Sequence, residues 1–358
     1  METIQRWLLY PFSFIYALIM FLRNLFFDIK IIQSKKLSVP VISVGNITAG
    51  GTGKTPVVAF IAKMLQNDGY KVGIISRGYR RSSKGYVVVS DGSEVFVNAG
   101  RGGDEPVMLA HKVSGAVVAV HEKRYRGGKF LIEDYGVNVI IMDDGFQHRA
   151  LHRDLDIVLI NASKTDHLRA HIPAGRLRER LQSLQRADIV IVTKYRDDGM
   201  VKSIEKLVHR YTNAPVIGSE IIPEDIFDVR QGKIIAIKDI ATKKAFLFSG
   251  IAHPGEFYKT VDDLGVTISG YHWFPDHHSF SERDIHYVLQ EAKQHNADII
   301  LTTEKDAVRL RQYKQLFTEA VPLYAVAIAF SVSSYDKNVL ENCVHRTMNK
   351  NKRSITIN

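Results

Sequence analysis

The chain has little cysteine and no cysteine-based metal motif. Cys343 is the single cysteine among 358 residues, so an internal disulfide is impossible and a zinc site built on clustered cysteines is excluded. A reducing cytoplasm is the compartment that this composition favours. Internal repeats and low-complexity tracts are also missing. With 45% hydrophobic residues, the length predicts two folded domains, each with its own core.

Acidic residues are outnumbered by basic ones, 38 against 48, which gives a formal net charge of +10. An excess of this size indicates an anionic partner: nucleic acid, anionic lipid or a phosphorylated small molecule. The sequence shows no nucleic-acid-binding motif and begins with an apolar segment, so we expect lipid and no nucleic acid. Basic groups suited to phosphates gather in three segments. They are Arg77, Arg80, Arg81 and Lys84, then Lys123, Arg124, Arg126 and Lys129, then Arg176, Arg178 and Arg180.

Charge is absent from Trp7–Leu22, a run of sixteen residues near the N-terminus. A helix of that length rises roughly 24 Å, against a hydrocarbon core of about 30 Å, and Pro11 would disturb its early turns. We therefore predict that residues 1–27 form a membrane-associated helix embedded in one leaflet, with Arg23 and Lys30 on the cytoplasmic side. The alternatives are a helix buried against the protein's own core and a helix that spans the membrane.

From residue 39 onward, short runs of Val and Ile alternate with helical segments. This alternation predicts an α/β fold of the P-loop NTPase type, with a mostly parallel sheet and flanking helices over residues 28–235. A smaller α/β domain is expected over 236–345, and a basic, frayed tail over 346–358. The predicted strands are 39–44, 72–76, 117–120, 137–142, 157–161, 189–193 and 216–221, then 246–249, 266–271, 299–302 and 324–330.

A glycine-rich segment, GNITAGGTGKT at residues 45–55, stands between a predicted strand and a predicted helix. Such a loop turns backbone N–H groups toward phosphates, the lysine reaches the outer phosphates, and the threonine can hold magnesium. Thr48 occupies the first glycine position of the consensus. The competing interpretation is a glycine-rich turn with a chance Gly-Lys-Thr. The predicted nucleotide-binding residues are Gly50, Gly51, Thr52, Gly53, Lys54 and Thr55.

The strand at 138–142 ends in Asp143 and Asp144. A buried strand that ends in a carboxylate can face the metal through its water shell. Many strands end in Asp, but together with the phosphate loop the pattern predicts a phosphotransferase that uses a nucleoside triphosphate and Mg²⁺. Because adjacent side chains diverge, only one of the two acids is expected to face the metal.

Guanine recognition of the GTPase kind requires an Asp at residue 196, where this chain has Arg. A GTPase is therefore disfavoured. Lys194 follows the strand 189–193, near the expected position of the nucleotide base, and we include it among the nucleotide-binding residues. A solvated lysine at a strand end is the alternative.

Two further segments contain groups that could act on a substrate. Asp104 and Glu105, in GDEP at 103–106, stand at a loop or helix start, where a carboxylate could accept a hydroxyl proton or bind metal. By itself this pattern is also that of a helix cap. The FPDHH segment at 274–278 could supply a histidine that pairs with an acid across a cleft between the domains. The alternative is a pair of surface histidines on a loop.

Taken together, these motifs resemble the tetraacyldisaccharide 4′-kinase family, which acts in lipid A biosynthesis. The resemblance covers most of the chain, and its motifs occur in the family's order. They are the apolar N-terminus, SVGN at 43–46, GGTGKTP at 50–56, SRGY at 76–79, GDEP at 103–106, MDDGFQH at 142–148, LRE at 177–179, FPDH at 274–277 and TEKD at 303–306.

The resemblance implies transfer of the ATP γ-phosphate to the 4′-hydroxyl of a tetraacylated glucosamine disaccharide 1-phosphate. The protein would bind the inner membrane as a peripheral or monotopic protein, with its active site facing the cytoplasm. Asp104 would be the catalytic base, supported by His277. Glu105, Asp143 and Asp144 would join Thr55 around the metal, and Tyr79, Arg124 and Gln147 would contact the lipid substrate.

The chain departs from the family pattern at Arg180, where a proline is expected after LRE. The roles of Arg178 and Glu179 are left open for that reason. An alternative from another class is a membrane-associated P-loop ATPase that acts by nucleotide-dependent assembly. A small-molecule kinase that merely sits on membranes is a further alternative.

Overall fold

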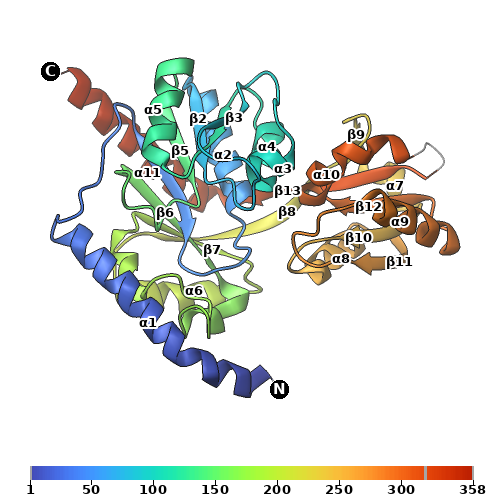
Figure 1. The fold of residues 1–358 in the computed structure, drawn as a ribbon, viewed down its shortest axis with the longest axis horizontal. Helices are drawn as coiled ribbons and strands as arrows, with labels where there is room; N and C mark the ends of the chain where they lie inside the picture. Colours follow the sequence, from blue (N-terminus) through green and yellow to red (C-terminus); the bar gives the residue numbers. More distant parts are fainter. Residues whose placement is uncertain (1, 318–320, 357–358) are drawn as a thin grey trace.

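The computed structural model describes residues 2–317 and 321–356, and one mixed sheet of thirteen strands organises it (Figure 1). Strand β1 (Val41–Asn46) lies between β5 (Val139–Asp143) and β6 (Leu155–Asn161) and is parallel to both. All three strands are buried throughout, because parallel strands are covered on both faces. The remaining strands on this side are β2 (Val72–Ser76), β3 (Val87–Ser90), β4 (Val117–Val120) and β7 (Ile189–Thr193). We call β1–β7 and their helices the core unit.

Helices cover both faces of the core unit (Figure 1). One face packs against α2 (Lys54–Asn67), α4 (Asp104–Lys112) and α11 (Ser334–Thr356). The opposite face packs against α5 (Arg124–Tyr135) and α6 (Asp198–Val208). Short helical segments complete this part of the chain: α3 (Ala99–Gly102), η1 (Ala162–Leu168) and η2 (Leu181–Arg186).

Strand β8 (Val216–Asp228) connects the core unit to a smaller one. Its first residues pair with β7 in parallel, and residues from Glu220 onward pair with β13 (Leu323–Ser331) in the antiparallel direction. We call β9–β13 with α7–α10 and η3 the small unit. Its elements are β9 (Ile234–Ile235), α7 (Ile237–Ala241), β10 (Lys244–Ser249), α8 (Pro254–Asp263), β11 (Thr267–Trp273), α9 (Glu282–Gln294), β12 (Ile299–Thr303), α10 (Glu304–Leu310) and η3 (Arg311–Leu316). The predicted P-loop α/β fold with a mostly parallel sheet is confirmed.

The structure differs from the predicted strands at three places. Strands β3 and β9 were not predicted, because each is short and lies where pairing with a neighbouring strand decides the structure. Strand β8 extends seven residues beyond the predicted 216–221, since β13 stabilises a segment that contains Pro223.

A frayed tail was expected over 346–358, but residues 346–356 form the end of α11, which continues to Thr356; positions 357–358 lie outside the described residues. Leu340, Val344 and Met348 recur every four residues and lie buried in the core of the core unit. This apolar stripe stabilises a helix whose sequence is otherwise mostly polar. The C-terminal helix thus returns from the small unit to the core unit, and the predicted boundaries at 236–345 do not describe this return.

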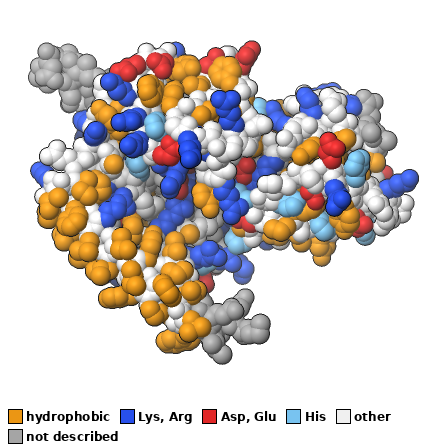
Figure 2. Space-filling model, in the orientation of Figure 1, with side chains coloured by type: hydrophobic (Ala, Val, Ile, Leu, Met, Phe, Trp, Pro, Cys, Tyr) orange, Lys and Arg blue, Asp and Glu red, His pale blue; other side chains and the backbone are white. Residues whose placement is uncertain are grey.

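Helix α1 (Glu2–Asp28) runs along the outside of the core unit (Figure 1). It continues through Pro11 without a break, so the expected disturbance does not occur. Most of its large apolar side chains point away from the protein, and Figure 2 shows them as a continuous hydrophobic surface. Trp7 and Phe14 are each 71% exposed. A helix buried against the protein's own core is therefore excluded.

Polar contacts hold the inner side of α1 against the core unit. Ser13 Oγ donates to the carbonyl oxygen of His171 at 3.0 Å, and Tyr16 Oη donates to that of Arg178 at 3.0 Å. Asn24 Nδ2 donates to the buried carboxylate of Glu179 at 3.1 Å. Glu179 therefore helps to seat α1 on the core unit.

Candidate active site

The glycine-rich segment forms the loop between β1 and α2. Gly53, with φ 79°, precedes the first residue of α2 in a left-handed conformation that favours glycine. Asn46 Nδ2 donates to Thr52 Oγ1 at 3.0 Å, and Thr193 Oγ1 donates to the carbonyl oxygen of Thr52 at 3.1 Å. The loop is thus tied to β1 and β7, which preorganises the N-terminus of α2 for an anion.

Thr48 is accommodated because this part of the loop pairs with another segment. Thr48 forms an antiparallel bridge with Leu177, while Ala49 N donates to the carbonyl oxygen of Arg176 at 2.7 Å. The backbone at position 48 therefore does not need the conformational freedom of glycine. The LRE motif therefore supports the phosphate loop directly, which its position in the sequence does not reveal.

The two acids after β5 have different surroundings. The Asp144 carboxylate accepts from Arg178 Nη1 at 2.8 Å and lies 3.4 Å from Lys54 Nζ. Burial alone would raise the pKa of Asp144, but Lys54 and Arg178 lower it below its usual range. Asp144 is therefore an ionised partner of the phosphate-loop lysine.

Asp143 is fully buried, and Ser76 Oγ donates to its Oδ2 at 3.0 Å. Burial, followed by the nearby carboxylates of Glu105 and Asp144, raises the pKa of Asp143. Within the described part of the chain, Oδ1 of Asp143 has no hydrogen-bond partner. A buried carboxylate oxygen without a partner, close to two further acids, fits the surroundings of a hydrated divalent cation.

Among the described residues, no group of three His, Cys, Asp or Glu side chains is placed to enclose a metal ion. This agrees with the chemistry of Mg²⁺, which keeps several water ligands and takes one or two ligands from the protein. The hydroxyl of Thr55, buried at the start of α2, is the protein group suited to direct contact. Glu105, Asp143 and Asp144 are suited to contact through water.

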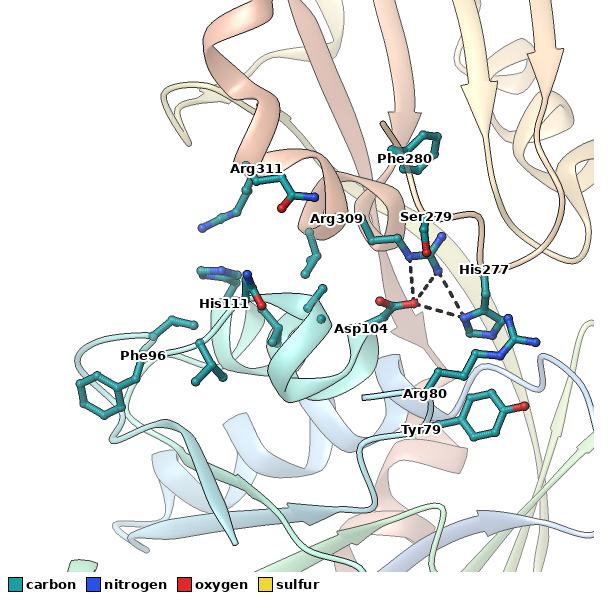
Figure 3. Close-up of a pocket in the computed structure, with 18 residues that line it drawn as sticks. Tyr79, Arg80, Phe96, Asp104, His111, His277, Ser279, Phe280, Arg309 and Arg311 are labelled. Carbon is teal, nitrogen blue, oxygen red and sulfur yellow. Dashed lines mark hydrogen bonds and ion pairs between the residues drawn. The ribbon is translucent and has the colours of Figure 1, made fainter. Parts of the chain in front are cut away.

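Asp104 and His277 meet between the two units, with His277 Nδ1 3.2 Å from Asp104 Oδ2 (Figure 3). Asp104 is the first residue of α4, and His277 lies on the loop after β11 with φ 61°. Arg309 of α10 also contacts Asp104 Oδ2, through Nη2 at 2.5 Å and Nε at 2.9 Å. Burial would raise the pKa of Asp104, but hydrogen bonds from His277 and Arg309 lower it to about 2.

A cavity of about 660 Å³ opens beside this cluster. Asp104, His277 and Arg309 line one part of it, and Phe96 and His111 line the opposite part (Figure 3). Tyr79 is 63% exposed, and its ring meets the His277 ring edge-on at 5.8 Å. Of the three residues predicted to contact the lipid, Tyr79 is the one that lines this cavity.

The other two predicted lipid contacts lie near the phosphate loop and at the start of α5. Gln147 Nε2 donates to the carbonyl oxygen of Asn46 at 3.0 Å, which ties it to the end of β1. Arg124 is buried, and its Nη1 donates to the carbonyl oxygen of Glu122 at 3.1 Å. Burial and the neighbouring Arg77 lower the pKa of Arg124 to about 10. Buried positive charge of this kind suits an anionic group.

Lys194 follows β7 in a left-handed conformation, with φ 55°. Its Nζ lies 2.5 Å from the carboxylate of Glu256 on α8. The lysine therefore bridges the core unit and the small unit at the carboxyl end of the sheet. The solvated-lysine alternative does not describe this position.

Arg309 is a functional candidate that the sequence did not indicate. It is buried, it bonds to Asp104, and its Nη1 also donates to Asp306 Oδ1 at 3.0 Å. The TEKD motif, which includes Asp306, was the available signal. An acid and an arginine three residues apart on a helix can pair, but only the fold shows that the arginine then reaches Asp104.

The fold and this site define a P-loop phosphotransferase. Comparison with known proteins then gives the family: the chain belongs to the tetraacyldisaccharide-1-P 4′-kinases, whose family model matches residues 5–349. It is similar to the tetraacyldisaccharide 4′-kinase of Chlorobaculum parvum, with 40% identity over 313 residues, which cover 86% of this chain and 85% of that one. The enzyme of that name from Desulfotalea psychrophila is 37% identical over 339 residues, covering 93% of this chain and 95% of the relative.

A solved structure is similar over nearly the whole length. The crystal structure of LpxK from Aquifex aeolicus in complex with ATP aligns with a TM-score of 0.78 and 31% identity. The alignment covers 96% of this chain and 99% of that chain. The alternative of an assembly ATPase is not favoured by these comparisons.

Proposed function

We propose that this protein transfers the γ-phosphate of ATP to the 4′-hydroxyl of a tetraacylated glucosamine disaccharide 1-phosphate, a step of lipid A biosynthesis. The observation that carries the proposal is the contact between Asp104 and His277. It joins a carboxylate of the core unit to an imidazole of the small unit, beside a cavity large enough for a sugar. Family membership supports the identity of the acceptor.

In the proposed reaction, the acceptor hydroxyl loses its proton to Asp104. The oxygen of the acceptor hydroxyl forms a bond to the γ-phosphorus, and the bond from that phosphorus to the oxygen of ADP breaks. Such a transfer requires in-line positioning and neutralisation of charge, which Lys54 and the backbone N–H groups of residues 50–55 supply. Thr55 would hold Mg²⁺, with Glu105, Asp143 and Asp144 around it. Bound Mg²⁺ would neutralise charge on the phosphate oxygens.

The remaining roles follow from location. We assign Lys194 to the nucleotide, because it lies at the carboxyl end of β7, where ligands bind in α/β sheets. Tyr79 offers an exposed ring at the mouth of the cavity for contact with a sugar face. Arg124 and Gln147 are assigned to the anionic headgroup of the lipid, and Gln147 also links that contact to the phosphate loop.

The direct test uses labelled ATP, Mg²⁺ and a monophosphorylated tetraacyl disaccharide, with the products separated by thin-layer chromatography. We expect label on the lipid in proportion to the ADP formed. Phosphate release without labelled lipid, together with ATP-dependent dimerisation, would instead support an assembly ATPase. In a parallel assay with a water-soluble sugar in place of the lipid, label on the sugar and none on the lipid would support a small-molecule kinase.

We also propose that α1 binds the inner membrane from the cytoplasmic side, in one leaflet. The segment Trp7–Asp28 is apolar and long enough to cross a membrane, with a mean hydropathy of 1.5. Its inner side, however, is bonded to the core unit by Ser13, Tyr16 and Asn24. A helix held along a folded unit and exposed on the other side fits an interfacial position better than a span.

Replacement of Leu8, Phe12, Phe14 and Ile15 together by Ser is expected to lower binding to anionic vesicles by at least about 10²-fold. Each such side chain contributes roughly 1.5–3 kcal/mol when it leaves water completely, and an interfacial helix buries its apolar side chains in part. All four are exposed on α1, so the fold should be retained. Vesicle sedimentation measures the effect. Replacement of the exposed Ile234 and Tyr335 by Ser provides the control. Equal binding by all variants would show that α1 is not the anchor.

A further inference from the structure

Helix α10 presents two cationic side chains, Arg309 and Lys305, to the Asp104–His277 pair. Figure 3 shows Arg309 beside Asp104 and His277. Arg309 is buried, and all three of its guanidinium nitrogens have partners. Nε and Nη2 donate to Asp104, while Nη1 donates to Asp306 Oδ1 at 3.0 Å and to the carbonyl oxygen of Gly250 at 3.2 Å. Asp306 is itself held by Thr303 Oγ1 at 2.7 Å. Asp306 and Gly250 therefore fix the guanidinium in the orientation in which it contacts Asp104.

The contacts of the Asp104 carboxylate are distributed unequally between its two oxygens. Both bonds from Arg309 and the bond from His277 Nδ1 end on Oδ2. In the described part of the chain, no hydrogen bond reaches Oδ1. An oxygen that already accepts three hydrogens has little capacity for another, so the free lone pairs of this carboxylate are on Oδ1.

Lys305 contacts the ring nitrogen of His277 that faces away from Asp104. Its Nζ lies 3.4 Å from His277 Nε2, and an ammonium group can only donate, so Nε2 is the acceptor. The proton is then on Nδ1, which donates to Asp104. The carboxylate of Asp276 lies 4.0 Å from Nε2, beyond hydrogen-bond distance. Arg309 Nη2 is 3.4 Å from Nδ1, but its shorter bond at 2.5 Å goes to Asp104.

We propose that Arg309 and Lys305 are positioning residues for the phosphoryl transfer. Arg309 fixes Oδ2 of Asp104, and Lys305 fixes His277 with its proton on Nδ1, so that Oδ1 receives the proton of the acceptor hydroxyl. The hydroxyl O–H bond breaks, an Oδ1–H bond forms, and the electron pair left on oxygen makes the new bond to phosphorus, while the bond from that phosphorus to the oxygen of ADP breaks. This inference rests on the proposed function and assigns a role to the TEKD motif and to the arginine that follows it.

The Arg309 part is tested by steady-state kinetics of full-length variants with the lipid acceptor. Arg309→Met is expected to lower kcat by about 10²-fold, the cost of a misplaced catalytic group, with KM for ATP unchanged within about twofold. Arg309→Lys keeps the charge but not the two-point contact, and is expected to recover part of the loss. Arg283→Met, at an exposed arginine of α9, is the control. A wild-type kcat for Arg309→Met would overturn this part.

The Lys305 part has a readout that does not depend on activity. In full-length protein labelled with ¹⁵N-histidine and held in detergent micelles, the ring nitrogen shifts of His277 report which nitrogen is protonated. The signal is assigned as the one that disappears in His277→Gln. We expect the Nδ1–H form in the wild type and a mixture of both forms in Lys305→Met, with kcat reduced by about tenfold. An Nε2–H form in the wild type would overturn the assignment.

These outcomes separate the inference from the function on which it rests. If the wild type transfers no label to the lipid, the proposed acceptor is wrong, while the NMR result still decides the protonated nitrogen. If the wild type is active and both Arg309→Met and Lys305→Met match it in kcat and in ¹⁵N shifts, the proposed acceptor is correct and the proposed positioning roles are wrong. Arg309→Met leaves the buried Asp306 without one partner, which could destabilise the fold. The thermal unfolding of the Arg309→Met variant is therefore compared with that of the Arg309→Lys variant. A loss of activity that follows the loss of folded protein would count against a positioning role.

Discussion

Asp104→Asn is expected to lower kcat by about 10³-fold and to leave KM for ATP nearly unchanged, within the range of general acid–base contributions. Asparagine keeps the size of the side chain and can still accept from Arg309 through its oxygen, but it cannot take up the proton of the acceptor hydroxyl. The measurement is steady-state transfer of label from ATP to the lipid over a range of ATP concentrations. The selective loss of kcat would separate catalysis from nucleotide binding.

Asp262→Asn, at an exposed acid of α8, is the matched control and should behave like the wild type. His277→Ala should also lower kcat, but less than Asp104→Asn, since Arg309 continues to hold the carboxylate. If Asp104→Asn retains kcat within a few-fold of the wild type, Asp104 is not the base.

The low pKa of Asp104 makes it a weak base, and the chemistry of phosphoryl transfer makes this tolerable. The pKa is about 2, below the usual value of about 3.9, so the carboxylate is ionised throughout the neutral range. The stabilisation gained from this lowered pKa is present above the unfolded-state pKa and is lost as pH falls toward about 2. In a loose transition state the hydroxyl proton need not leave early, so an ionised and correctly oriented acceptor suffices.

The sequence indicated the sheet and the phosphate loop because both depend on local signals. Buried parallel strands appear as continuous runs such as 139–142 and 189–192, and the loop requires glycine where Gly53 has a positive φ. The same locality explains the errors. Strand β3 exists through its pairing with β4, and the end of α11 depends on a stripe at Leu340, Val344 and Met348 that begins before the basic tail.

The site residues that lie inside motifs could be predicted from the sequence. Those outside the motifs were missed when they reach the site from a distant part of the chain. Asp104 and His277 could be proposed as a pair from the resemblance, although 173 positions separate them. Arg309 lies 205 positions from Asp104 and just beyond the TEKD motif, and only the packing of α10 against α4 joins them. Likewise, Arg178 had no assigned role until the fold placed it beside Asp144.

Lys54→Met is the second substitution with a large expected effect: kcat should fall by on the order of 10²–10³-fold, and KM for ATP should rise by roughly tenfold. Lys54 begins α2 with its side chain 11% exposed, and its Nζ lies 3.4 Å from Asp144 Oδ1. Methionine keeps the length and the apolar stem but removes the charge from the outer phosphates. Steady-state kinetics together with equilibrium binding of a fluorescent ATP analogue would separate the two effects.

The control lies on the same helix, where Lys63→Met removes an exposed lysine that is 3.5 Å from Glu224 and is expected to change neither constant. Lys54→Arg tests the geometry of the group while its charge is kept. A guanidinium retains the charge, but its planar fork cannot occupy the position of a compact ammonium at the start of α2, so little activity should return. If Lys54→Met retains a near-normal kcat with lipid acceptor, neutralisation of the transferred phosphate must depend on other groups, with Arg178 beside Asp144 the first to examine.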